Sequence, residues 1–353
     1  MNAFRFSIQR IIRNPVLNIA VSCVRKIRNG CKRLISEFIY SKLICKKASL
    51  PFTDLQGLAS DIPLDIFYAL KRNYFPSNHY YGNEDILRKY AHIPDHWKLN
   101  LTIEHGIALN NFCWVQGEID VKGNSGVIVS SRYREKVVKQ HTNKPIYNIG
   151  RLILYADSYL DDISFKELKK KWGKVLLYFP VHSTHFTTAF PDKNIAWDQI
   201  NQITEFDTIV VCLYWKDILN GVAEFYKSKK CICVTAGHIF DPLFLSRLRS
   251  IIELADMTVC DEVCGSFGNS LALGKPCMVL NNSCIRKFDV ESDKSEFKNI
   301  DEDVNWRKLN NLFNHPYRTL SEEQFQAVDY YYGLTKKCSP EEIRSIFMRH
   351  LRK

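Results

Sequence analysis

The chain has 353 residues, of which 46% are hydrophobic and 25% are charged, which fits a globular protein of two domains. A core can be buried at this length without disulfides, and none of the twelve cysteines forms a Cys-x-x-Cys pair, so we expect buried free thiols. Residues 1–47 hold eleven Lys and Arg but one acid, Glu37, so most of the +11 net charge lies there. The remainder is nearly neutral, which argues against a nucleic-acid partner.

The basic N-terminal segment, residues 1–47, has apolar residues at helical spacing, and Pro15 and the Asn29-Gly30 pair divide it into two or three helices. Basic amphipathic helices lie in the interface of an anionic membrane. Packing on the protein's own body and binding to nucleic acid are the alternatives. The longest uncharged stretch, residues 14–24, is too short to span a bilayer.

Eight short apolar runs follow from residue 98 onward, separated by longer amphipathic stretches. Runs that are continuously apolar are typical of strands in parallel sheets with helices on both faces. The predicted fold class is therefore α/β, in two groups of strands with a boundary near residues 160–172. The runs are 99–104, 127–130, 146–149, 175–179, 208–214, 232–235, 257–260 and 278–280.

Three helix starts can be predicted from capping residues. Asp241, which a proline follows, predicts an N-cap. Ser321 with Gln324, and Ser339 with Glu342, predict capping boxes for two C-terminal helices.

Polar side chains follow several predicted strands, where ligands bind in open α/β sheets. A single histidine at such a place usually makes a structural hydrogen bond, but several together favour a site. The strand-end candidates are Glu104, His105, His182, Ser183, Thr184 and His238. No Asp-x-Asp follows an apolar run, so we expect no metal.

Gly265-Ser266-Phe267-Gly268 forms a predicted turn between a strand and a helix that begins near Asn269. Small residues at a helix N-terminus let backbone N–H groups approach a phosphate, and the helix dipole favours its charge. The same residues also suit a plain tight turn, so both interpretations stay open.

Residues 255–281, which include Gly265-Ser266 and Gly274-Lys275-Pro276, resemble the donor-binding segment of GT-B glycosyltransferases. Asn269 stands where those families often have Glu. The stretch NLTIEHG, residues 100–106, is similar to the CDP-glycerol glycerophosphotransferase and bacterial capsule-type transferase families, in which the histidine acts on the acceptor hydroxyl.

The resemblance implies two Rossmann-like domains that face each other across a cleft. These would be an acceptor domain at 48–165 and a nucleotide-donor domain at 166–310, with the basic helical segment at 1–47 and C-terminal helices at 311–353. It implies a metal-independent glycosyltransferase of capsule or lipopolysaccharide synthesis, without a cofactor, that moves a sugar from a nucleotide-sugar to a surface polysaccharide or lipid-linked glycan. Such an enzyme would be cytoplasmic and peripheral on the inner face of the cell membrane, bound to anionic lipid through residues 1–47.

His105 is then the expected general base, with Glu104 as a candidate to orient it. The expected donor-binding residues are His182, Ser183, Thr184, His238, Gly265, Ser266, Gly268 and Asn269. Three alternatives remain: a polyol-phosphate transferase, a sugar-nucleotide epimerase with the same fold, and an inactive membrane-peripheral scaffold.

Overall fold

The computed structural model describes residues 38–62, 75–106, 109–184, 187–280, 282, 284–288 and 303–351. Residues 1–37, which make up most of the predicted basic segment, lie outside the described residues. The chain forms two compact units, Met1–Ser49 with Ile62–Arg72, and Leu50–Asp61 with Asn73–Lys353. In the first unit, residues 38–48 are helical. No helix within the described ranges is long and apolar enough to cross a membrane.

The second unit contains a five-stranded parallel sheet in the order β7-β6-β4-β8-β9. Every residue of the two central strands, β4 and β8, is buried, as their continuous apolar sequences predict. The strands are β4 (Val175–Phe179), β6 (Thr208–Cys212), β7 (Ile232–Val234), β8 (Met257–Cys260) and β9 (Cys277–Val279).

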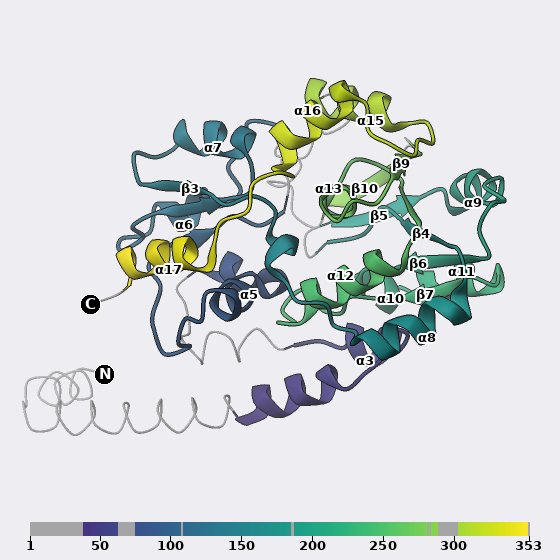
Figure 1. Ribbon diagram of the computed structural model, residues 1–353, viewed down its shortest axis with the longest axis horizontal. Helices are drawn as coiled ribbons and strands as arrows, with labels where there is room; N and C mark the ends of the chain where they lie inside the picture. Colours follow the sequence, from purple (N-terminus) through teal and green to yellow (C-terminus); the bar gives the residue numbers. More distant parts are fainter. Residues whose placement is uncertain are drawn as a thin grey trace, which may run out of the picture. The chain divides into compact units, whose positions relative to one another are not determined.

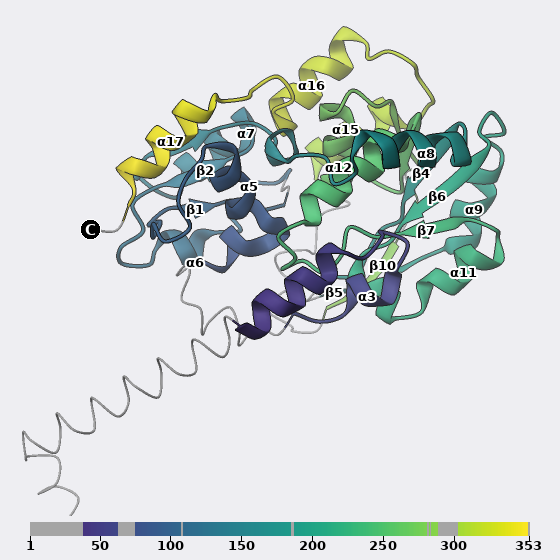
Figure 2. The same cartoon turned by 60° about the horizontal axis from the view of Figure 1, so that its bottom comes forward.

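Helices cover both faces of this sheet. Figure 2 shows α8 and α12 on one side of the strands and α11 on the other. The core on the second side contains side chains of α3, α9, α10 and α11 packed on the strands. The helices associated with this sheet are α3 (Leu55–Ala59), α8 (Asp162–Trp172), α9 (Lys193–Asn201), α10 (Trp215–Leu219), α11 (Val222–Ser228), α12 (Phe244–Leu254) and α13 (Gly265–Ala272).

A three-stranded parallel sheet, β1-β2-β3, also belongs to the second unit. It comprises β1 (Thr102–Ile103), β2 (Val127–Val129) and β3 (Ile146–Asn148). The associated helices are η1 (Pro76–Gly82), α5 (Asn83–Tyr90), α6 (Gln116–Ile119), α7 (Arg132–Lys139) and η2 (Leu152–Tyr155). The prediction of an α/β fold with parallel sheets is confirmed, and each of the eight predicted runs contains or overlaps one of these strands.

Three C-terminal helices complete the second unit: α15 (Val304–Phe313), α16 (Glu322–Tyr332) and α17 (Pro340–Arg349). Both predicted capping boxes are confirmed at the starts of α16 and α17. Figure 1 shows α17 beside the three-stranded sheet. The Asn100 N–H donates to the His350 carbonyl at 2.8 Å, and Leu99 forms a bridge with Leu351. The end of the described chain is therefore joined to the start of that sheet.

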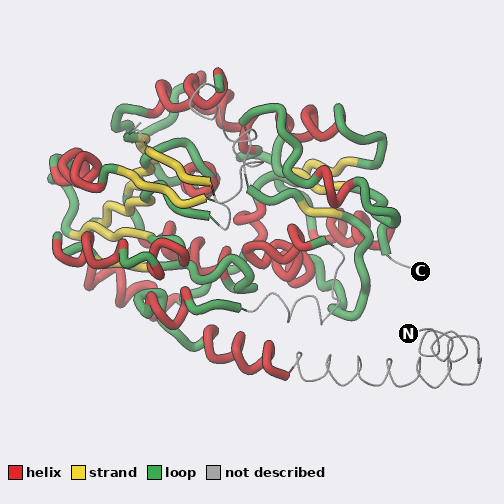
Figure 3. The backbone as a smooth tube through the Cα atoms, turned by 180° about the vertical axis from the view of Figure 1, so that it is seen from behind, coloured by secondary structure: helices red, strands yellow, loops and turns green. Residues whose placement is uncertain are grey.

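Two features differ from the sequence prediction. A two-stranded antiparallel ribbon, β5 (Thr187–Pro191) with β10 (Cys284–Phe288), was not predicted; Figure 3 shows its strands side by side. The N-cap of α12 is Leu243 rather than Asp241. The Asp241 carboxylate instead accepts from the Leu243 N–H at 2.9 Å and pairs with Arg247 at 2.8 Å.

Candidate functional site

The order in which the chain adds strands to the five-stranded parallel sheet reverses between β4 and β8. The chain passes from β4 to β6 to β7 on one side, and then from β8 to β9 on the other. At such a reversal in open parallel sheets, the loops that follow the two strands usually diverge and form a ligand-binding crevice at the carboxyl ends of the strands. The predicted candidates His182, Ser183 and Thr184 follow β4, and Gly265 to Asn269 follow β8. The topology therefore brings two of the predicted groups to one place.

Two buried carboxylates hold the loop after β4, residues 181–184. Asp261, just past β8, accepts from the Val181 N–H at 2.8 Å and from the Tyr178 hydroxyl at 2.7 Å. Asp217, in α10, accepts from the Ser183 N–H at 3.2 Å. Burial raises the pKa of Asp261 to about 6. Burial also raises the pKa of Asp217, against the opposing charge of His182 nearby.

Only His182 of the three predicted residues in this loop presents an exposed side chain. Its Nδ1 lies 3.0 Å from the Ser183 carbonyl oxygen, and its ring stacks on Tyr214 at 4.4 Å between centroids. Ser183 is fully buried, and its hydroxyl accepts from the Ala189 N–H at 3.1 Å. Thr184 accepts from the Lys216 ammonium through its carbonyl at 2.6 Å. Ser183 was predicted to line the site, and its burial corrects that prediction: it supports the loop.

A chain of ring contacts joins three of the predicted histidines. Each step brings two ring centroids within 4.4 to 6.0 Å. The order of the rings is His105, Tyr80, Phe240, His238, Trp215, Tyr214 and His182. The strand-end histidines that follow β1, β7 and β4 therefore belong to one aromatic cluster rather than to separate places on the surface.

His238 lies inside this aromatic cluster. It is 1% exposed, and its Nδ1 accepts from the Phe240 N–H at 3.3 Å. Its Nε2 lies 3.4 Å from the Asp61 carboxylate. These contacts occupy both ring nitrogens, so His238 orders the loop after β7 rather than offering a ring atom to a donor.

His105 and Glu104, which follow β1, have separate surroundings. Arg134 donates to both Glu104 oxygens, at 3.0 and 2.6 Å, and burial raises the pKa of Glu104 despite this partner. Neither oxygen bonds to His105 in the described part of the chain, so the suggested orienting role of Glu104 lacks a contact. The His105 Nδ1 is buried and has no hydrogen-bond partner among the described residues. Burial lowers the pKa of His105 to about 4, so its ring is neutral at pH 7.

Gly265 and Gly268, which follow β8, lie inside α13. This helix begins at Gly265 rather than near Asn269, where the sequence predicted its start. A Cβ atom on Gly265 would meet no heavy atom within 4 Å, so the first turn has open space beside it. A Cβ on Gly268 would lie 2.0 Å from the Tyr332 ring. Gly268 is therefore small because α16 packs against it, which corrects its predicted place in a phosphate cradle. Gly265 and Ser266 stay candidates.

Asn269 is buried and bonded to Arg151, a residue that the sequence interpretation did not single out. Its side-chain oxygen accepts from Nε and Nη2 of Arg151 at 3.2 and 2.5 Å. Arg151 also donates to the Gly265 carbonyl at 3.1 Å, and burial lowers its pKa to about 10. The arginine comes from the segment after β3 and holds the first turn of α13. Asn269 therefore supports the helix, since its oxygen faces Arg151.

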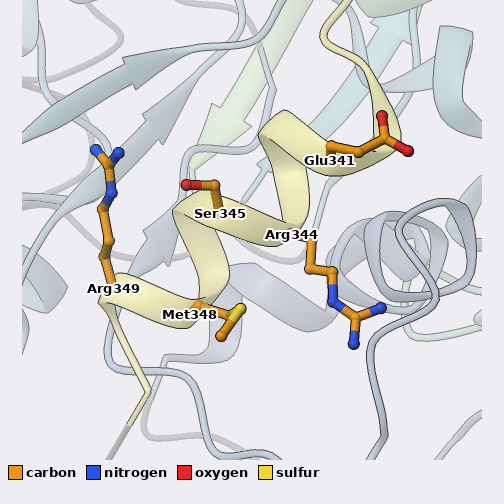
Figure 4. Close-up of a pocket in the computed structure, with 5 residues that line it drawn as sticks. All are labelled: Glu341, Arg344, Ser345, Met348 and Arg349. Atoms are coloured by element: carbon orange, nitrogen blue, oxygen red, sulfur yellow. The ribbon is translucent and has the colours of Figure 1, made fainter.

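A surface hollow of about 400 Å³ lies elsewhere, along α17 (Figure 4). It is lined by Glu341, Arg344, Ser345, Met348 and Arg349, all from that one helix. None of these residues was predicted for the site, and none follows a strand.

Comparison with known proteins gives no family assignment. No family model matches the chain, and no curated protein matches it. One similar solved structure is that of the wall teichoic acid polymerase TagF, with a TM-score of 0.32 and 12% sequence identity. The match covers 64% of this chain and 53% of that one, so it spans about half of the polymerase's length. A likeness this distant assigns no activity to the chain.

Proposed function

We propose that this protein is a transferase that moves a sugar or a polyol phosphate from a nucleotide-activated donor to a surface-glycan acceptor. The observation that carries the proposal is the arrangement at the reversal between β4 and β8. There the preorganised loop with His182 and the open first turn of α13 follow adjacent strands. Crevices of this kind hold nucleotides in open parallel sheets.

The N-terminus of α13 would hold the donor's diphosphate. Backbone N–H groups at a helix N-terminus and the helix dipole favour a negative charge. Gly265 leaves room for the phosphate beside the first turn, and Arg151 fixes the position of that turn. His182 would lie on the other side of the crevice.

His105 would act as the general base on the acceptor hydroxyl. Its buried Nδ1 has no partner among the described residues, and its low pKa leaves the ring unprotonated at pH 7. A base in position typically contributes about 10² to 10⁴ in rate. Residues 1–47 would bring the enzyme to an anionic membrane that carries the acceptor.

Thermal unfolding with CMP, CDP, UDP, GDP and ADP tests the proposal. A ligand at 100 times its Kd adds about 2.7 kcal/mol to the free energy of unfolding, which shifts Tm by several degrees. We expect one nucleoside diphosphate to do this, and Ser266→Phe, in the first turn of α13, to abolish the shift. Ser345→Phe, on the exposed face of α17, is the matched control and should leave the shift intact. If none of the five nucleotides raises Tm, the chain does not bind a nucleotide donor and the proposal fails.

Product analysis then separates the activities. Incubation with the matching nucleotide-sugar should release the nucleotide and extend an added glycan acceptor. Conversion to an isomeric nucleotide-sugar would instead identify an epimerase. His105→Ala should lower turnover at least a hundredfold while donor affinity stays within about twofold.

A further inference from the structure

Two buried carboxylates, Asp217 and Asp261, accept hydrogen bonds from the backbone of one short loop, residues 181–184. Asp217 is 6% exposed and Asp261 is 1% exposed. Burying a carboxylate costs free energy unless hydrogen bonds compensate it, and both of these accept backbone N–H groups of residues 181–184. The two come from different elements, α10 and the end of β8. Their convergence on this loop indicates that its geometry is tightly specified.

The residue between the two tethered N–H groups is His182. Asp261 holds the N–H of residue 181 and Asp217 holds that of residue 183, so the backbone is fixed on both sides of the histidine. Lys216 holds the next carbonyl, that of residue 184, at 2.6 Å. His182 has the exposed side chain of this loop, whereas Ser183 is buried.

The ring of His182 is oriented as well as its backbone. A carbonyl oxygen only accepts hydrogen bonds, so the Nδ1 that lies 3.0 Å from the Ser183 carbonyl carries the hydrogen. In the neutral ring the lone pair is then on Nε2. No described residue bonds to Nε2. Stacking on Tyr214 fixes the ring plane.

We infer that His182 is the side chain presented to the ligand in this crevice, through Nε2, and that Asp217 and Asp261 are positioning residues for it. The ligand class rests on the proposed function: the diphosphate of a nucleotide. When Nε2 takes up a proton from solvent, it donates a hydrogen bond to a phosphate oxygen. The Nδ1–H bond to the Ser183 carbonyl persists in both protonation states.

The ring geometry can be tested without a ligand. Two-bond ¹H–¹⁵N correlation spectra of the full-length protein with labelled histidine distinguish the Nδ1–H from the Nε2–H form. We expect the neutral His182 ring to be in the Nδ1–H form, and Asp217→Asn and Asp261→Asn to give a mixture of both. Asp256→Asn is the matched control, because Asp256 accepts the Val175 N–H at 2.7 Å at the opposite end of β4. An Nε2–H form in the wild type, or an unchanged ring in Asp217→Asn, would overturn the inference.

The ligand contact is tested by calorimetry with the nucleoside diphosphate that binds most tightly among CDP, UDP, GDP and ADP. His182→Ala and Asp217→Asn should each weaken binding about tenfold, and Asp256→Asn should stay within twofold. Combining Asp217→Asn with His182→Ala should add no further loss, because Asp217 acts through the ring. A full additional loss in the double variant would overturn the inference. If no nucleotide binds, the proposed function fails, and the ring spectra alone decide the positioning roles.

Discussion

Asp261 has surroundings that should make the stability of the protein depend on pH. Its carboxyl group is buried, so the charged form is disfavoured and its pKa rises from 3.8 to about 6. The native state thus holds this proton more tightly than the unfolded chain does. Below pH 3.8 the protonated Asp261 therefore adds about 3 kcal/mol at most to the free energy of unfolding. This contribution is lost as the pH rises through 6.

Asp261→Asn removes this titration. We expect the free energy of unfolding of the variant, minus that of the wild type, to increase by about 2 to 3 kcal/mol between pH 4 and pH 7. Urea unfolding at the two pH values measures it, and other titrating groups cancel in the difference. Asp256→Asn should change in the opposite direction. Burial acts to raise the pKa of Asp256, but bonds from Lys169 and Val175 bring it below its usual value. A difference that does not vary with pH would show that Asp261 is not buried as described.

Histidines at strand ends could be predicted from the sequence, but their partners could not. His105, His182 and His238 stand directly after apolar runs, so their place follows from the order of the chain. Asp217 lies 34 residues from Ser183, whose N–H it accepts, and Arg151 lies 118 residues from Asn269. Neither position carries a local signal in the sequence. A carboxylate or guanidinium that bonds to a distant loop is indistinguishable in sequence from a solvated surface charge.

At the scale of elements, buried strands were predictable and the half-exposed ribbon was not. The runs at 175–179 and 257–260 coincide with β4 and β8, because strands buried on both faces are continuously apolar. The β5–β10 ribbon pairs segments almost a hundred residues apart, and its strands expose Phe190 and Ile285. Pairing that is non-local and half-exposed leaves neither a continuous apolar run nor a hairpin turn in the sequence.

Packing of α13 against α16 gives a prediction about Gly268. An added methyl group would lie 2.0 Å from the Tyr332 ring, which is itself fully buried. We expect Gly268→Ala to lower the free energy of unfolding by about 1 to 3 kcal/mol, because the two helices must separate. Gly265→Ala, in the same helix with open space beside it, should raise it by up to about 1 kcal/mol. Urea denaturation measures both. Equal stability of the two variants would contradict the close approach of the helices.

Across the whole chain, the excess of positive charge is concentrated in the basic N-terminal segment. Residues 1–47 hold eleven of the 49 Lys and Arg residues, while the rest of the chain is nearly neutral. Each basic residue near an anionic membrane surface contributes about 1 kcal/mol. We therefore predict that Arg5, Arg10, Arg13 and Arg25, changed together to Gln, reduce association with phosphatidylserine vesicles at least a hundredfold.

Co-sedimentation of the full chain with vesicles of increasing phosphatidylserine content measures the association. A matched variant that changes four lysines of α7 and α8 to Gln, namely Lys136, Lys139, Lys166 and Lys170, removes the same charge from the body. It should retain association if the segment, rather than total charge, is responsible. An equal loss in both variants would assign the effect to net charge. Sedimentation that persists in 0.5 M salt would contradict an electrostatic contact, because exposed charges are screened beyond a few ångströms at that ionic strength.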